Sequence, residues 1–371
     1  RADAPAFSEV IGQREARRAL EIAAAGGHNV LLVGPPGAGK SMLAKRLPGI
    51  LPEMTYDEAL ETTNIYSVGG LLPEDLPLMV ERPFRAPHHT ATLAAMAGGG
   101  AQASPGEVTL AHNGVLFLDE TPHFARPVLE ALRQPLEDRC ITIARNRATV
   151  TYPGNIQLIG AMNPCPCGYY GVPYTENGRV CSCSLQDIRR YADKLSGPFL
   201  DRIDIHVRVR PVPERLLLEA ARSECSADIR ARVVAARDRQ KARFEGSGTT
   251  CNAGMTRTQL LEYCALDDAC RDALLVAHEK HQFSARSNDK ILKVARTIAD
   301  LAGLDTLTHL DISNNTIRNL DPITSMEGMK ELHMQHNAIT SLEALTLMYQ
   351  LETLDVSFNA LSDLTPLGAC I

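Results

Sequence analysis

The residues best suited to catalysis form a short glycine-rich run. It directly follows the apolar residues 30–33 and consists of Gly34, Pro35, Pro36, Gly37, Ala38, Gly39, Lys40 and Ser41. Glycines in such a run let backbone N–H groups converge on a phosphate, the lysine reaches the β- and γ-phosphates, and the serine hydroxyl holds Mg²⁺. The pattern predicts a strand, a phosphate-binding loop and a helix over 41–46, with ATP and Mg²⁺ as ligands.

Further polar groups follow two apolar runs that we expect to be strands. Asp119 and Glu120 come directly after residues 114–118, and Asn163 follows residues 156–162. Ligands of open parallel sheets bind at the carboxyl ends of the strands, so these side chains are expected near the phosphates. Asp119 would complete the Mg²⁺ shell and Glu120 would orient the attacking water. Asn163, which alone would be typical of a turn, is expected to grip that water and the γ-phosphate.

The order of these motifs resembles that of AAA+ ATPases. Segments 7–13, 82–90, 132–137, 162–168 and 196–204 are similar to one branch of them, the YifB/ComM family of magnesium-chelatase-like proteins. The resemblance covers residues 7–303 and implies an α/β fold, in which a parallel sheet flanked by helices forms the P-loop core and an α-helical lid follows.

The same resemblance carries functional implications. It implies a hexameric ring that acts as a DNA helicase in branch migration during natural transformation. It also adds Ile11, Gly12 and Gln13 to the residues that bind the nucleotide.

Two arginines match family positions that act on the γ-phosphate. The resemblance implies that Arg202 is a finger that enters the neighbouring subunit's site, and that Arg286 is the sensor 2 arginine of the lid. The alternative for Arg202 is a structural ion pair with Asp201 or Asp204. The alternative for Arg286 is a solvated position at the start of a helix. An arginine finger would require an oligomer.

Four of the ten cysteines form two closely spaced pairs, which are Cys165, Cys167 and Cys181, Cys183. Four thiolates from two such pairs can close a tetrahedral Zn²⁺ site, and the segment between them has too few apolar residues for a core of its own. Reduced thiols without a metal and disulfides are the alternatives. Disulfides are disfavoured, because the chain shows no signal peptide and no apolar stretch of 18 residues.

A basic hairpin is expected between the Asp-Glu strand and the Asn163 strand. Residues 140–144 and 148–152 alternate as two strands, and Arg145 and Arg147 lie in the connection. Its place in the chain matches the pore hairpin of related helicases, so we expect both arginines to contact single-stranded or branched DNA. The alternative is that they are simply solvated.

From residue 304 the sequence repeats every 22 residues. Two of the repeating columns are Leu310, Leu332, Leu354 and Asn315, Asn337, Asn359. This resembles leucine-rich repeats, in which each unit contributes a short strand, the leucines fill a continuous core and the asparagines hydrogen-bond the turns. The outward strand positions are polar and slightly acidic, which suits a protein partner.

The composition favours a globular chain of three parts. We expect an ATPase core over 1–210 that includes the hairpin and the cysteine insertion, a helical lid over 211–303 and three repeats over 304–371. Residues 304–371 carry two Lys or Arg and nine Asp or Glu, so the net charge of −6 belongs to the repeats. The content of 44% apolar and 22% charged residues is typical of a soluble globular chain. Because the sequence shows no signal peptide and no apolar stretch of 18 residues, we expect a cytoplasmic protein without a membrane partner.

The two ends favour a fusion. The chain begins at Arg1 without the Lon-protease-like domain that the resemblance implies upstream, and the lid pattern passes directly into repeats near Gly303. We therefore expect a natural or engineered fusion, in which the lid helix ending near Leu301 caps the repeats.

Three functions compete at this point. The first is an ATP-driven ring motor on DNA. The second is a chelatase-type or protein-remodelling ATPase, and the paired cysteines, which are not expected in chelatase subunits, weigh against it. The third is a nucleotide-dependent protein-binding module in which the shortened lid impairs turnover. Against this third function, the chain has the full set of expected catalytic residues, which are Lys40, Asp119, Glu120, Asn163, Arg202 and Arg286.

Overall fold

The computed structural model divides the chain into two compact units, residues 1–254 and 255–371. It describes residues 6–73, 76–99, 104–144, 149–172, 179–212, 224–266, 268–281, 284–303, 309–315, 317–318, 320, 329–346, 348 and 351–369. The two units are described separately below.

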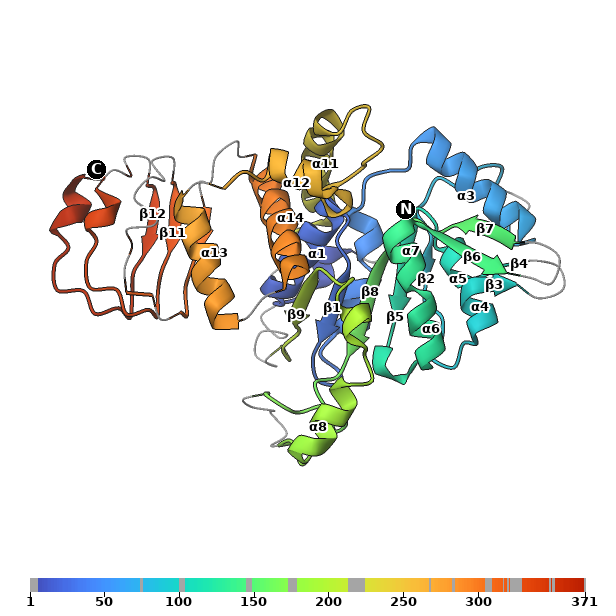
Figure 1. Ribbon diagram of the computed structural model, residues 1–371, viewed down its shortest axis with the longest axis horizontal. Coiled ribbons are helices and arrows are strands. Elements are labelled where there is room, and N and C mark those ends of the chain that lie inside the picture. Colours follow the sequence, from blue (N-terminus) through green and yellow to red (C-terminus); the bar gives the residue numbers. More distant parts are fainter. Residues whose placement is uncertain are drawn as a thin grey trace. The chain divides into compact units, whose positions relative to one another are not determined.

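The first unit contains a five-stranded parallel sheet in the order β2-β5-β8-β1-β9. Figure 1 shows these strands side by side. Their bounds are β1 Val30–Val33, β2 Phe84–Arg85, β5 Gly114–Leu118, β8 Ile156–Met162 and β9 Ile205–Arg208. The central strands are almost entirely apolar because both faces of the sheet are covered, which is typical of parallel sheets. The polar exception, Gln157 in β8, is buried and donates to the carbonyls of Ala23 and His28. The predicted parallel sheet is therefore present, and β5 and β8 are direct neighbours in it.

Two small antiparallel pairs accompany the main sheet. They are β3 Gly98–Gly99 with β4 Ser104–Pro105, and β6 Cys140–Ala144 with β7 Thr149–Pro153. The second pair is the expected hairpin, in register from Cys140 opposite Pro153 to Ala144 opposite Thr149. Arg145 and Arg147, predicted to contact DNA, lie outside the described residues.

Helices surround the main sheet. The α-helices of this unit are α1 Arg14–Gly26, α2 Lys40–Ala44, α3 Tyr56–Val68, α4 Leu93–Ala97, α5 Glu107–Leu110, α6 Arg126–Ala131, α7 Arg133–Asp138, α8 Leu185–Ala192, α9 Gly197–Leu200 and α11 Ser226–Arg243. The 3₁₀ helices are η1 Phe7–Glu9, η2 Leu47–Ile50, η3 Thr121–His123 and η4 Asn252–Gly254. Helix α1 packs against β1, β9 and α11. The apolar core includes the buried Leu31, Leu116, Leu158 and Phe199.

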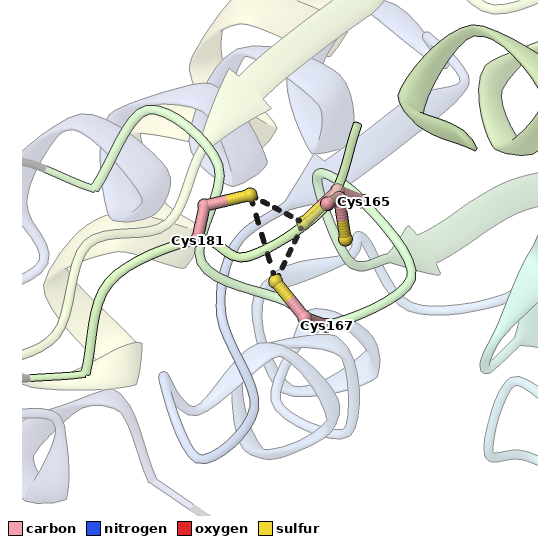
Figure 2. A group of neighbouring side chains, drawn as sticks. Cys165, Cys167 and Cys181 are labelled. Atoms are coloured by element: carbon pink, nitrogen blue, oxygen red, sulfur yellow. Dashed lines mark hydrogen bonds between the residues drawn. The ribbon is translucent and has the colours of Figure 1, made fainter. Parts of the chain in front are cut away.

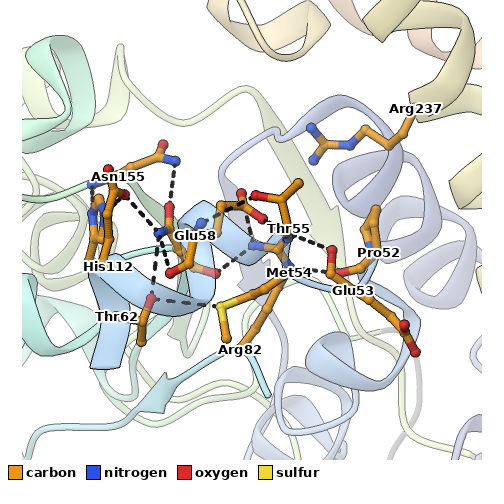
Figure 3. Close-up of polar contacts among 12 residues, drawn as sticks. Pro52, Glu53, Met54, Thr55, Glu58, Thr62, Arg82, His112, Asn155 and Arg237 are labelled. Carbon is orange, nitrogen blue, oxygen red and sulfur yellow. Dashed lines mark hydrogen bonds and ion pairs between the residues drawn. The ribbon is translucent and has the colours of Figure 1, made fainter. Parts of the chain in front are cut away.

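Arg82 joins the segment before β2 to the start of α3 and to the turn before β5 (Figure 3). Its Nε donates to Pro52 O at 2.7 Å, and its Nη1 donates to Asn113 O at 2.8 Å. Its Nη2 donates to Glu53 O at 3.2 Å and forms an ion pair with Glu58 Oε2 at 2.9 Å. These contacts hold together three segments that are distant in sequence, so Arg82 stabilises the packing of α3 next to strands β2 and β5.

The second unit combines helices with a repeat segment. It contains α12 Arg257–Tyr263, α13 Asp268–His281, α14 Ala285–Ala302, η6 Glu343–Leu345 and η7 Thr365–Ala369. Ser284 caps the first turn of α14, and Gly303 ends it with a left-handed φ of 73°. Strands β10 His309–Asp311, β11 Glu331–His333 and β12 Thr353–Asp355 form a parallel sheet in the predicted register of one repeat.

The repeats are held by an apolar core and by asparagines. Leu332, Met334 and Ile339 are fully buried. Asn337 Nδ2 donates to Ile312 O at 2.9 Å and to Met334 O at 3.0 Å, so it joins two successive turns. Asn359 makes the equivalent pair of bonds one repeat later. The expected leucine-rich-repeat architecture is therefore present. Among the described helices, none has the length and apolar character needed to cross a membrane.

Candidate nucleotide-binding site

The glycine-rich run forms the loop between β1 and α2. Gly34 passes so close to the neighbouring strand segment that a Cβ there would lie 2.2 Å from Val209 O. Gly39 has a φ of 88°, in the left-handed region that favours glycine. The loop therefore needs glycine for two separate reasons, close backbone approach and backbone conformation.

Lys40 lies at the start of α2 with its ammonium inside the loop. Its Nζ donates to Gly34 O at 2.6 Å, to Pro35 O at 2.8 Å and to Asn163 Oδ1 at 3.1 Å. Burial lowers the pKa of this lysine, and the carboxylates of Asp119 and Glu120 partly oppose the shift. A positive charge that is already desolvated and oriented is well suited to bind an anionic phosphate.

Ser41 and Asp119 meet across the sheet edge. Ser41 Oγ donates to Asp119 Oδ2 at 2.6 Å, although the two residues are distant in sequence. Hydroxyl and carboxylate oxygens are the ligands that Mg²⁺ prefers. The residues present therefore fit the predicted magnesium ion, which Ser41 and Asp119 would hold.

Glu120 lies beside two histidines that were not predicted as site residues. Its Oε2 is 3.4 Å from His89 Nδ1 and 3.4 Å from His123 Nδ1. Glu120 has a φ of 49°, and its side chain is half exposed. The signals available in the sequence were the segment 82–90, which contains His89, and the spacing of three residues from Glu120 to His123. The arrangement leaves the carboxylate accessible to water while histidines restrict its position.

Asn163 directly follows β8 and reaches Lys40, as described above. On its other side, the backbone of Asn163 hydrogen-bonds the phenol of Tyr191 on α8. Burial raises the pKa of Tyr191, and that backbone hydrogen bond opposes the increase. Tyr191 is 6% exposed and carried no signal in the sequence beyond its aromatic type. The structure thus brings together Lys40, Ser41, Asp119, Glu120 and Asn163.

The amino-terminal segment contacts the loop through one of its three predicted residues. Gln13 Nε2 donates to Ala38 O at 3.0 Å and to Arg210 O at 2.6 Å. Gly12 lies beside Val212: a Cβ added to Gly12 would be 3.6 Å from Cγ1 of Val212, which is ordinary van der Waals contact. Ile11 precedes them and is half-buried. Gln13 therefore links the segment at residues 11–13 to the loop and to the end of β9.

Arg202 forms an ion pair, but with neither of the two neighbours considered above. Its Nη2 pairs with Glu137 and its Nη1 donates to Pro198 O, while the buried Nε has no hydrogen-bond partner. Asp204 instead contacts His28 Nδ1 at 3.1 Å. Arg202 is therefore held inside its own subunit, and to act as a finger it would have to exchange Glu137 for a phosphate.

Arg286 lies in the first turn of α14, in the second unit, with an exposed side chain. Its sensor 2 role stays a prediction.

The four paired cysteines come together next to the phosphate-binding loop. The Sγ atoms of Cys165, Cys167, Cys181 and Cys183 all lie within 4.8 Å of one another. Figure 2 shows three of these sulfur atoms pointing toward a common centre. Burial raises the pKa of the Cys167 thiol, but hydrogen bonds from the backbone and from neighbouring thiols lower it to about 6. Within the described residues, this is the group of three or more His, Cys, Asp or Glu side chains that lie close enough together to hold a metal ion.

The fold and the site define the class of protein. A parallel sheet in the order β2-β5-β8-β1-β9 carries the phosphate-binding loop after β1, the two carboxylates after β5 and the asparagine after β8. This arrangement is the P-loop core of an AAA+ ATPase. Residues 6–217 match the family of the magnesium chelatase subunit ChlI, residues 223–316 match the C-terminal domain of that subunit, and residues 305–347 match two copies of leucine-rich repeats.

The chain belongs to the magnesium-chelatase-like family, in its YifB/ComM branch. It is 46% identical to YifB of Salmonella typhimurium over 307 residues, which are 81% of this chain and 57% of that protein. It is 47% identical to the competence protein ComM of Haemophilus influenzae over 300 residues, which are 80% of this chain and 56% of that protein. The chain thus spans little more than half the length of these relatives.

Proposed function

We propose that this protein hydrolyses ATP and uses the energy as a ring-forming motor on single-stranded or branched DNA. The observation that carries the proposal is the convergence of Lys40, Ser41, Asp119, Glu120 and Asn163 at one edge of the sheet. A P-loop alone would support nucleotide binding. Hydrolysis needs in addition a metal-holding acid and a group that orients water.

Each side chain has a distinct task in this proposal. Lys40 binds the β- and γ-phosphates when they replace its carbonyl partners. Ser41 and Asp119 would hold Mg²⁺, and the ion, when bound, would supply positive charge next to the phosphate oxygens. Glu120 orients the attacking water, and Asn163 grips that water and the γ-phosphate. Arg202 and Arg286 would stabilise the departing phosphoryl group, with Arg202 acting across the interface of a hexamer.

DNA is proposed as the substrate on two grounds. The hairpin β6–β7 occurs between β5 and β8 in chain order, where the expected basic connection carries Arg145 and Arg147. In addition, one relative is named a competence protein. The DNA-binding constant falls as salt rises, and each contact to a DNA phosphate makes the plot of its logarithm against log salt steeper by about one unit. Replacing both arginines by glutamate should therefore make this plot shallower by about two units.

The decisive experiment is steady-state ATP hydrolysis with and without single-stranded and forked DNA. Wild type is compared with Glu120→Gln, which keeps the shape of the side chain and removes the carboxylate. Glu279→Gln, an exposed substitution on α13, is the matched control. We expect DNA to stimulate wild type and the control, and Glu120→Gln to lose at least about a hundredfold in turnover while still binding ATP. Hydrolysis that ignores DNA would contradict the DNA motor.

A protein substrate is the second candidate, and the repeats favour it. In the parallel strands β10, β11 and β12, the polar residues Asp311, His333 and Asp355 lie next to one another at matching positions. Because this part of the chain is acidic, it suits a protein partner better than a phosphate backbone. Slow ATP hydrolysis that is unaffected by DNA would favour this candidate.

A further inference from the structure

We propose that Cys165, Cys167, Cys181 and Cys183 hold a structural Zn²⁺, and that the resulting zinc knuckle holds the phosphate-binding loop and Asn163 in position. The term zinc knuckle here means the described residues 165–172 and 179–183. The metal site stands on the cysteine geometry alone. Its coupling to nucleotide binding rests on the function proposed above.

The sulfur positions fit one tetrahedral metal ion. Sγ of Cys165 is 3.3 Å from Sγ of Cys167 and 3.7 Å from Sγ of Cys181, and the last two are 3.6 Å apart. A tetrahedron with Zn–S bonds of about 2.3 Å has sulfur atoms about 3.8 Å apart. A disulfide needs an S–S distance of about 2.05 Å, so the arrangement is not that of a disulfide. Four thiols therefore surround a point that a single soft cation would fill.

The surroundings of the sulfur atoms are those of thiolate ligands. The backbone N–H of Tyr170 donates to Cys165 Sγ at 3.3 Å, a contact typical of the outer shell of a metal site. Cys165 is fully buried. Several thiolates placed together repel one another unless a cation neutralises them, whereas Zn²⁺ supplies both the charge and the folding energy of a segment that lacks an apolar core.

The zinc knuckle contacts the nucleotide site in two ways. Cys165 follows Asn163 by two residues, so the position of Cys165 restrains the amide that Lys40 contacts. Gly168 packs directly on the phosphate-binding loop, because a Cβ added there would lie 2.5 Å from Pro36 Cδ. The metal would thus fix one segment that reaches both Pro36 and Asn163.

The first experiment measures the metal. Zinc and iron are quantified by mass spectrometry in the purified protein, and Co²⁺ replacement is followed by its thiolate charge-transfer absorption. We expect about one zinc per chain, lost in Cys167→Ser/Cys181→Ser and kept in the control Cys140→Ser/Cys225→Ser, whose cysteines lie outside the cluster. Iron in place of zinc, no metal in wild type, or zinc that survives the first pair of substitutions would overturn the site.

The second experiment tests the coupling without touching a cysteine. Gly168→Ala introduces the clash with Pro36. Gly171→Ala is the control, because its added Cβ would meet nothing within 4 Å. Both glycines have left-handed backbones, with φ of 90° at Gly168 and 70° at Gly171, so both variants carry a similar conformational cost. Binding of a fluorescent ATP analogue is measured together with zinc content. We expect Gly168→Ala to bind the analogue about tenfold more weakly than Gly171→Ala.

The outcomes separate the two proposals. Equal affinity in the two glycine variants, or full affinity in a Gly168→Ala protein that has lost its zinc, would overturn the coupling. Loss of zinc and of affinity together would support it. A wild-type protein that carries zinc but binds no ATP analogue would leave the metal site standing and would contradict both the ATPase and the coupling.

Discussion

The same amide side chain serves different purposes in the two units. In the first unit, Asn163 contacts Lys40, a side chain that itself is suited to bind phosphate. In the second unit, Asn337 is saturated by backbone: it donates to Ile312 O and Met334 O and accepts from the N–H of Ile317. An amide occupied entirely by backbone groups contributes to stability, whereas an amide paired with a ligand-binding cation is available for chemistry.

A similar contrast separates two arginines of the first unit. Arg82 directs all its nitrogen atoms to acceptors in the segments that it joins. Arg202 has a buried Nε without a partner, and its ion pair with Glu137 is its main anchor. This difference suggests that Arg82 is structural and that Arg202 is able to change partners.

Replacing Arg202 should have the largest effect. If it stabilises the departing phosphoryl group across the subunit interface, Arg202→Ala should lower ATP turnover by about a thousandfold or more while nucleotide binding is kept. Turnover and binding are measured side by side, with the exposed Arg190→Ala as the control. A variant that unfolds more easily but hydrolyses ATP normally would show that the pair with Glu137 is only structural.

Replacing Asn163 should have the next largest effect. Loss of one group that contacts the reacting phosphate and water costs about a hundredfold in turnover. We therefore expect Asn163→Ala to lose that factor in single-turnover hydrolysis, with a melting temperature close to that of wild type. A fall in stability without a fall in turnover would place Asn163 in the same category as Asn337.

From the sequence, the strands that carry the site can be predicted, whereas most of the side-chain pairs at the site cannot. Strands β1, β5 and β8 are predictable because a strand buried on both faces is an almost entirely apolar run. The meeting of Ser41 with Asp119 follows from that topology. The pairing of Arg202 with Glu137 could not be predicted, because it depends on how α7 and α9 pack after the sheet has formed. The same holds for His89 beside Glu120.

Replacing Asn337 should affect stability alone. Asn337→Ala removes the side-chain partner of the Ile317 N–H and one of the two amide donors to the carbonyls of Ile312 and Met334. Such losses cost about 2 kcal/mol. We expect earlier thermal unfolding of the repeats and unchanged ATP turnover. Asn315→Ala is a graded comparison, since Asn315 is more exposed and its donated bonds stay within its own turn. A loss of turnover in Asn337→Ala would contradict the separation of roles.

The smallest effect is expected at Phe358. Its ring is 73% exposed and stacks on His336 with centroids 4.2 Å apart, and both residues have left-handed backbones with φ of 54° and 57°. The matching residue one repeat before His336 is Asn314, with a φ of 56°. Because asparagine tolerates this conformation better than phenylalanine, Phe358→Asn should offset the lost stacking and change stability by less than about 0.5 kcal/mol. Chemical denaturation measures this, and a loss above about 1 kcal/mol would mean that the ring stack contributes more to the repeats than its exposure suggests.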